Sequence, residues 1–184
     1  MRRLALALAA IFSAGAIPVA AQEDIGPKRG TMGVEAPIGS GGSLLRFRSP
    51  TSATVLSIAL SFTRQTEEDT AFSVLPDIRN IFFSEVRIGR RTYRSVDKRV
   101  RPYSTLSALV GYEDFTFQKG WRFGGAFETG VAYFFSDHVS AGVSNDFTLT
   151  YQVLDQANFA SPDSKLKIIA VRFSGFRLMG AVYF

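Results

Sequence analysis

The sequence contains no cysteine. This absence excludes disulfide bonds, thiol catalysis and a lipid anchor attached through a cysteine at a cleavage site. The sequence has a single histidine, His138. It shows no metal-ligand spacing, phosphate-binding loop or nucleotide motif. We therefore expect no metal, no cofactor and no catalytic residues.

Long hydrophobic runs are also missing after the first 21 residues. A membrane-spanning helix needs about 20 apolar residues. A chain without such a run can cross a membrane only as a closed β-barrel, which satisfies every backbone polar group in lipid.

The one apolar run, 4–17, has the layout of a secretory signal peptide. Arg2 and Arg3 precede it, and small residues at Val19 to Ala21 follow it before Gln22. An N-terminal membrane anchor is the alternative, but the run is shorter than a spanning helix needs. We predict a signal peptide at 1–21 and a mature domain at 22–184, exported from the cytoplasm.

The net charge of the chain is modest. It is +5 for the whole sequence, and loss of Arg2 and Arg3 leaves 19 basic residues against 16 acidic ones, which is +3. Because an exported protein seldom meets nucleic acid, we expect no nucleic-acid partner. The densest basic stretch, 90–101, suits either anionic lipid head groups or a solvated turn, and we favour the turn.

The C-terminal stretch alternates strictly between two kinds of side chain. Phe176, Leu178, Gly180, Val182 and Phe184 fall on one face of an extended strand, and the residues between them fall on the other. Such period-2 alternation predicts a strand between two different environments. Similar patterns predict eight strands, at 31–36, 43–48, 53–63, 81–93, 102–113, 121–135, 139–153 and 165–184, with 71–80 ambiguous and an irregularity near Gly175.

The composition of the two faces indicates which one points outward. A soluble barrel has an outer face rich in Lys and Glu, whereas the polar face here is mainly Ser, Gly, Ala and Thr. Aromatic residues gather towards the strand ends, as in the girdles of outer-membrane barrels. We assign this role to Trp121, Phe123, Tyr112 and Tyr151 at one rim, and to Tyr133, Phe135, Phe47 and Phe184 at the other.

An even number of strands places both chain ends on the periplasmic side. The turns at 49–52, 95–101 and 136–138 then lie in the periplasm. The connections at 37–42, 64–70, 114–120 and 154–164 lie outside the cell and are short. The fold class is therefore an all-β, eight-stranded, antiparallel up-and-down transmembrane barrel.

At this point the chain resembles a known group, the small outer-membrane barrels of the OmpA-type and OmpW-type. The resemblance rests on the signal peptide, the eight amphipathic strands and the terminal aromatic strand. It implies residence in the outer membrane, contact with its lipid, and insertion by the barrel-assembly machinery through a signal at Gly180 and Phe184. The periplasmic peptidoglycan-binding domain of full-length OmpA-type proteins is expected to be absent, because nothing follows Phe184.

Charged residues on the polar face are expected to point into the lumen. Unpaired charges are costly in a narrow lumen, so Glu128 and Asp146 should pair with Arg122, Arg177 or Arg46. The expected lumen charges are Arg46, Arg48, Glu85, Arg87, Arg91, Glu113, Arg122, Glu128, Asp146 and Arg177. We favour a salt-bridge plug over an open pore, because eight strands enclose little space.

These features predict a monomer with a structural or surface-interaction role. Two alternatives stay open, namely a narrow channel for small or apolar molecules, as OmpW-type barrels suggest, and a soluble periplasmic lipid-binding barrel with the opposite facing.

His138 and Ser140 invite comparison with outer-membrane lipid A deacylases, which use a His and a Ser at this spacing. The resemblance fails at Ala141, where those enzymes have Asn. The predicted topology also places His138 at a periplasmic turn, away from the outer leaflet. A nucleophilic Ser needs a base oriented by a third group, and no acid partner is evident. We therefore expect that the protein is not an enzyme.

Overall fold

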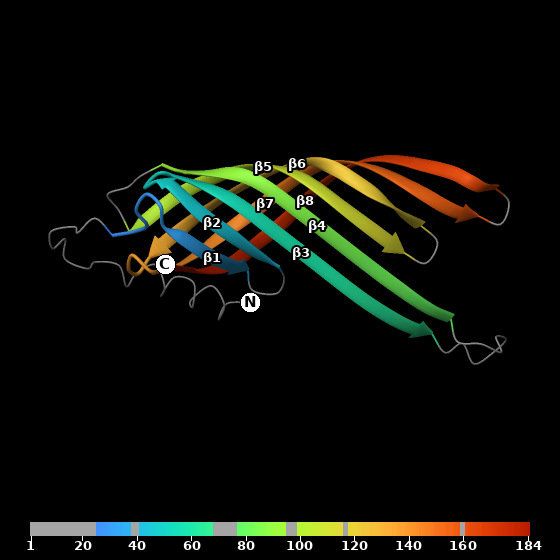
Figure 1. The fold of residues 1–184 in the computed structure, drawn as a ribbon, viewed down its shortest axis with the longest axis horizontal. Coiled ribbons are helices and arrows are strands. Elements are labelled where there is room, and N and C mark those ends of the chain that lie inside the picture. The colour runs from blue at the N-terminus through green and yellow to red at the C-terminus, as the bar shows by residue number, and fades with distance from the viewer. Residues whose placement is uncertain (1–24, 38–40, 68–76, 95–98, 116–117, 159–160) are drawn as a thin grey trace, which may run out of the picture.

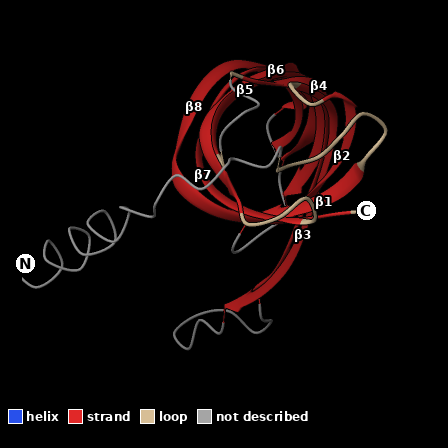
Figure 2. Ribbon diagram, turned by 90° about the vertical axis from the view of Figure 1, so that its left-hand side faces the viewer, coloured by secondary structure: helices blue, strands red, loops and turns tan. Residues whose placement is uncertain are grey.

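The computed structural model describes residues 25–37, 41–67, 77–94, 99–115, 118–158 and 161–184, so the predicted signal peptide lies outside the described residues. Each strand pairs antiparallel with the next, and β1 pairs with β8 to close the barrel (Figure 2). The predicted eight-stranded antiparallel barrel is confirmed. The strands are β1 (Met32–Pro37), β2 (Gly42–Ser49), β3 (Ser52–Glu67), β4 (Asp77–Tyr93), β5 (Val100–Phe115), β6 (Gln118–Phe134), β7 (Val139–Asn158) and β8 (Ser161–Tyr183). No described segment is a helix long and apolar enough to cross a membrane.

The barrel has two different ends. We call the end with the β2–β3, β4–β5 and β6–β7 connections and the C-terminus the terminal end, and the other the loop end (Figure 1). Several strands reach further towards the loop end than predicted. Glu67 of β3 still pairs with Asp77 of β4, and Gln156 of β7 with Ser164 of β8. The predicted connections 64–70 and 154–164 are thus partly strand, because backbone pairing with one neighbour needs no apolar alternation, which was the only strand signal in the sequence.

On one side of the barrel, the wall is formed by the two shortest strands, β1 and β2, and we call this side the low wall. β1 pairs with β8 only at 33–37, so in the described residues β8 has no partner on that side before Met179. β2 likewise pairs with β3 only as far as Ile58. Figure 1 shows the long β3–β4 and β7–β8 pairs diverging towards the loop end, with the short β1–β2 pair between them. In the described residues, the paired wall of the barrel is therefore shorter at β1 and β2 than at the other strands.

Side chains alternate between the outer face and the lumen along every strand. One prediction of facing was wrong. Arg46 and Arg48 of β2 are exposed on the outer face, while Leu45 and Phe47 are fully buried inside. Alternation distinguishes the two faces of a strand but does not show which face points into the lumen. Near the terminal end, the lumen holds an apolar cluster rather than charges. Phe47 belongs to that cluster and not to the outer aromatic girdle.

A β-bulge interrupts β8 where the sequence changes phase. Ser144 of β7 pairs with Arg177, but Asp146 pairs with Ser174. One residue of β7 therefore lies opposite two of β8, Gly175 and Phe176. The predicted irregularity at Gly175 is confirmed.

Gly130 of β6 is required by a close approach inside the barrel. A Cβ atom there would lie 2.6 Å from the ring of Tyr103 and 2.6 Å from the Val143 carbonyl oxygen. Gly125, on the outer face of the same strand, has only an ordinary contact, 3.6 Å from the Ser107 carbonyl oxygen. The lumen is packed tightly enough at this point that a methyl group does not fit.

We expect Gly130→Ala to lower the free energy of unfolding by about 1–3 kcal/mol, as overpacking does in cores. Gly125→Ala is the matched control and should stay within about 0.5 kcal/mol. Urea titration of the folded barrel in detergent, followed by gel mobility of unheated samples, measures both. Equal stability of the two variants would contradict the close packing of Tyr103 on β6.

Candidate functional site

The terminal end of the lumen is filled by an apolar cluster. Phe47 stacks on Tyr93 with ring centroids 5.8 Å apart, and Phe134 stacks on Tyr183, also at 5.8 Å. The buried members are Leu45, Phe47, Ala53, Val55, Tyr93, Tyr103, Ala132, Phe134, Met179, Ala181 and Tyr183. We call this set the aromatic cluster.

The segment 25–30 lies against the same end. Gly26 donates its backbone N–H to Asp137 Oδ1 at 2.7 Å. Arg101 donates to the Ile25 carbonyl oxygen, and its guanidinium lies 4.8 Å from the centre of the Phe134 ring. Pro27 is fully buried. The segment therefore covers the aromatic cluster from outside the strands.

A first group of charges lies next to the aromatic cluster, on its loop-end side. We call it the inner charge group; it consists of Arg91, Glu35 and Glu128. Arg91 of β4 donates to both oxygens of Glu35, at 2.6 and 2.9 Å, and lies 3.3 Å from Glu128. It also donates to Thr105 Oγ1 at 3.0 Å, and its guanidinium lies 4.1 Å from the centre of the Tyr103 ring. The Tyr103 hydroxyl donates to Glu128 at 2.9 Å. A buried cation is thus matched by two carboxylates and an aromatic face.

A second group of charges, the outer charge group, lies nearer the loop end. Arg87 bridges Glu85 at 2.5 Å and Asp146 at 2.6 Å. Arg122 pairs with Glu85, and Arg177 lies 3.8 Å from Asp146. These residues come from β4, β6, β7 and β8, so the ion pairs span the lumen.

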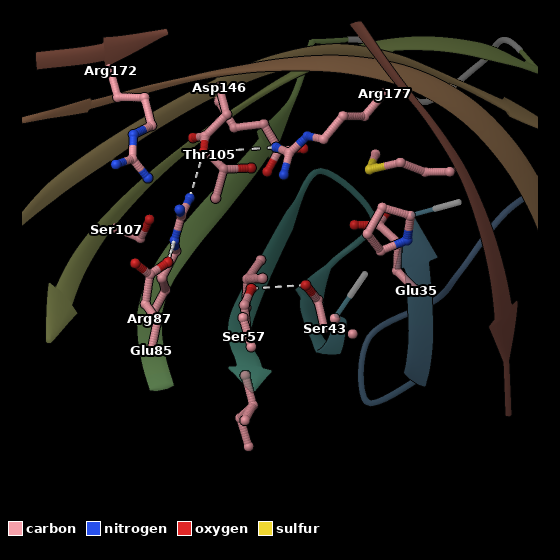
Figure 3. A pocket seen from close by; sticks show the side chains of 18 of the residues that line it. Glu35, Ser43, Ser57, Glu85, Arg87, Thr105, Ser107, Asp146, Arg172 and Arg177 are labelled. Atoms are coloured by element: carbon pink, nitrogen blue, oxygen red, sulfur yellow. Dashed lines mark hydrogen bonds and ion pairs between the residues drawn. The ribbon is translucent and has the colours of Figure 1, made fainter. Parts of the chain in front are cut away.

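Space remains beside the outer charge group. One cavity of about 250 Å³ reaches from the inner charge group to Pro37, Gly41 and Gly42 at the low wall. A second, of about 160 Å³, is lined by Arg87, Arg122, Arg172 and Arg177 and by the carboxylates Glu85 and Asp146. Figure 3 shows side chains from several strands around the first cavity, among them Glu85, Arg87, Asp146, Arg172 and Arg177.

Seven of the ten expected lumen charges form ion pairs in the inner or the outer charge group, and Glu113 is also buried. The seven are Glu85, Arg87, Arg91, Arg122, Glu128, Asp146 and Arg177. Asp146 meets Arg177 as expected, whereas Glu128 meets Arg91 rather than Arg122 or Arg177. Arg46 and Arg48 lie outside, where Arg48 donates to Thr54 at 3.0 Å.

Sequence reasoning missed three interior charges. Glu35 stands in a weakly predicted strand, although its alternation with Val34 was a usable signal. Arg101 stands in a predicted solvated turn but is buried. Arg172 reaches the lumen because the bulge changes the phase of β8. The change of phase near Gly175 was a usable signal, but it was not applied to Arg172.

Apart from Phe47, the predicted girdle residues lie on the outer face in two groups. Tyr112 and Trp121 are paired across β5 and β6 with ring centroids 5.2 Å apart. Tyr133 and Phe135 lie near the β6–β7 connection with centroids 4.9 Å apart. Phe123, Tyr151 and Phe184 are also exposed.

His138 and Ser140 both contact Tyr183 rather than each other. Ser140 Oγ is hydrogen-bonded to the Tyr183 hydroxyl at 2.9 Å, and His138 Nδ1 lies 3.1 Å from the Tyr183 carbonyl oxygen. Among the described residues no group of three or more His, Asp or Glu side chains could hold a metal ion. The expectations of no enzymatic activity and no cofactor stay predictions.

Comparison with known proteins supports the fold. No family model matches the chain, and no curated protein matches it. Among solved structures, the crystal structure of the outer membrane protein OprG from Pseudomonas aeruginosa superposes with a TM-score of 0.57 at 13% identity, covering 86% of this chain and 98% of that one. At this identity the likeness concerns the fold alone.

Proposed function

We propose that this chain is an integral outer-membrane β-barrel whose lumen is closed by charge pairs, and that its role is structural or one of surface interaction. The fold that it shares with OprG supports this proposal. The OmpA-type and OmpW-type groups are the two to which its sequence pattern is similar.

The composition of the outer face is the main observation that supports a membrane location. Large apolar side chains are exposed on every strand, and on β8 alone they run from Ile169 to Phe184. A soluble monomer rarely exposes an apolar patch beyond a few hundred Å². A barrel in lipid needs such a face, with aromatic residues near both rims. The examples with the greatest exposure are Leu60, Phe62, Leu106, Ile169, Phe173, Phe176 and Phe184. This facing disfavours a soluble periplasmic lipid-binding barrel.

A location in the outer membrane also implies two partners for the protein. Membrane lipid would contact the apolar face, and the outward Gly180 and Phe184 of the last strand would be read by the barrel-assembly machinery. The signal peptide at 1–21 would direct export. The closed ring of strand pairs leaves no need for a second copy, so we propose a monomer.

Closure of the lumen is supported by three successive layers. The aromatic cluster, the inner charge group and the outer charge group each contain side chains from opposite walls. Eight strands leave room for little beyond such side chains. Removal of the outer layer alone should therefore not create a pore.

A narrow channel for small or apolar molecules is the second candidate. Its support is the cavity of about 250 Å³ that reaches the low wall at Pro37 and Gly42. Such a route would lead from the loop end sideways and not through the aromatic cluster.

The single tryptophan allows a direct test of the membrane location. Trp121 is exposed on the apolar face near the loop end. In liposomes, we expect lipids with brominated acyl chains to quench its fluorescence strongly, while aqueous iodide quenches little. Quenching by iodide but not by brominated lipid would contradict the membrane location. A Trp121→Phe variant supplies the background.

A further inference from the structure

We propose that the outer part of the lumen binds an anionic group, a carboxylate or a phosphate, between Arg172 and Arg177 of β8. The cavity of about 160 Å³ is lined by four arginines, Arg87, Arg122, Arg172 and Arg177, but by only two carboxylates, Glu85 and Asp146. This inference goes beyond the proposed structural role, and it requires only the barrel interior.

Both carboxylates already accept from arginines, although one oxygen, Asp146 Oδ1, is buried without a hydrogen-bond partner among the described residues. Glu85 accepts from Arg87 and Arg122, and Asp146 accepts from Arg87 at 2.6 Å. Arg177 lies 3.8 Å from Asp146, which is too long for a hydrogen bond. Its Nε atom is buried and donates to no acceptor among the described residues, and the same holds for the Nε atom of Arg122. Among the described residues, two buried arginine Nε atoms therefore lack an acceptor, whereas one buried carboxylate oxygen, Asp146 Oδ1, lacks a donor.

Arg172 adds a cation that no described residue neutralises. It lines both cavities, and among the described residues it forms no ion pair. Figure 3 shows its guanidinium pointing into the cavity, on the opposite side of Asp146 from Arg177. Because the Arg172 side chain is exposed to water, its charge is tolerated there without an ion-pair partner.

The bulge at Gly175 builds this pair. Arg172 and Arg177 are five positions apart, so a regular strand would point them to opposite faces. The extra residue opposite Asn145 brings both into the lumen. The bulge therefore places the guanidinium groups of Arg172 and Arg177 at the same cavity.

The geometry defines the chemistry of the ligand. Two guanidinium groups suit the oxygens of a carboxylate or phosphate, which accept paired N–H donors. A space of about 160 Å³ holds such a group with a short stem and not a large solute. The group could arrive along the axis from the loop end as part of a free solute. It could also arrive over the low wall at Gly42 as the head group of a lipid.

Two probes separate these sources. Glycerophosphoglycerol is a soluble phosphodiester, and lysophosphatidylglycerol carries the same group on an acyl chain. We would titrate each by calorimetry into the folded protein in zwitterionic detergent. Equal affinities would identify a free solute as the source, and a clear preference for lysophosphatidylglycerol would identify a lipid.

For both probes, we expect Arg172→Gln and Arg177→Gln each to weaken binding about tenfold, the loss of one charge-assisted hydrogen bond. Lys167→Gln is the matched control, because Lys167 lies exposed on the outer face of the same strand. Its affinity should equal that of the wild type. Binding should also weaken as salt screens the charges.

A gain-of-binding variant guards against simple loss of folding. Asp146→Asn removes a carboxylate that competes for Arg87 and Arg177, so the affinity should rise. The proposal is overturned if neither probe binds the wild type, if the double variant Arg172→Gln, Arg177→Gln binds as the wild type does, or if Asp146→Asn leaves the affinity unchanged.

Discussion

Arg91→Leu should destabilise the barrel by about 3–5 kcal/mol, the cost of removing one partner from a buried ion pair. Arg91 is 1% exposed and holds Glu35 through two hydrogen bonds and Glu128 at 3.3 Å. Its loss leaves two carboxylates facing each other without a cation. Urea unfolding in liposomes, followed by the heat-dependent mobility of the barrel on gels, measures the loss.

Two variants make this result specific. Arg90→Leu changes the neighbouring arginine, which is exposed on the outer face and donates to Ser52 at 2.9 Å, so its effect should stay within about 1 kcal/mol. Adding Glu35→Gln to Arg91→Leu removes one of the two carboxylates that have lost their cation, and it should restore part of the stability. Equal effects of Arg90→Leu and Arg91→Leu, or no recovery in the double variant, would contradict the inner charge group.

Phe134→Ala should cost about 3–5 kcal/mol, as for other large aromatic side chains in cores. Phe134 is fully buried, packs on Tyr93 and Tyr183, and lies under the guanidinium of Arg101. Truncation opens a void in the aromatic cluster and removes the face against which Arg101 packs. The same unfolding assay measures the change.

The next residue provides the control. Phe135 is 56% exposed on the outer face, where its ring meets Tyr133. Phe135→Ala should cost about 1 kcal/mol, the value of one aromatic pair. If Phe135→Ala were as damaging as Phe134→Ala, the aromatic cluster would not be the packed centre of the terminal end.

The fold was predictable because a barrel wall repeats one physical rule. Each strand separates an apolar outer environment from a narrow lumen. Apolar and small or polar residues alternate accordingly over most of β5 to β8. The rule stops working at the loop end of β3 and β7, where the strands continue in polar sequence. It also inverts at Leu45 and Phe47, because the terminal end of the lumen is itself apolar.

The interior was only partly predictable for a related reason. Period-2 alternation identifies Glu85, Arg122 and Asp146 as sharing a face, but partners across the lumen depend on strand register and tilt. The pairing of Arg91 with Glu35, 56 positions apart in the sequence, follows from closure of β1 onto β8. The direction of Arg172 depends on the bulge near Gly175, where the sequence shows a change of phase but not which residues it turns towards a partner in the lumen.

Conductance across a planar lipid bilayer is the most direct test of a closed lumen. We expect wild-type protein to give no current steps above the background. Recovery of the fast-migrating folded band from the same preparation would demonstrate that the protein had inserted. Reproducible steps of constant size from the wild type would contradict closure by the aromatic cluster and the two charge groups, and would favour the channel.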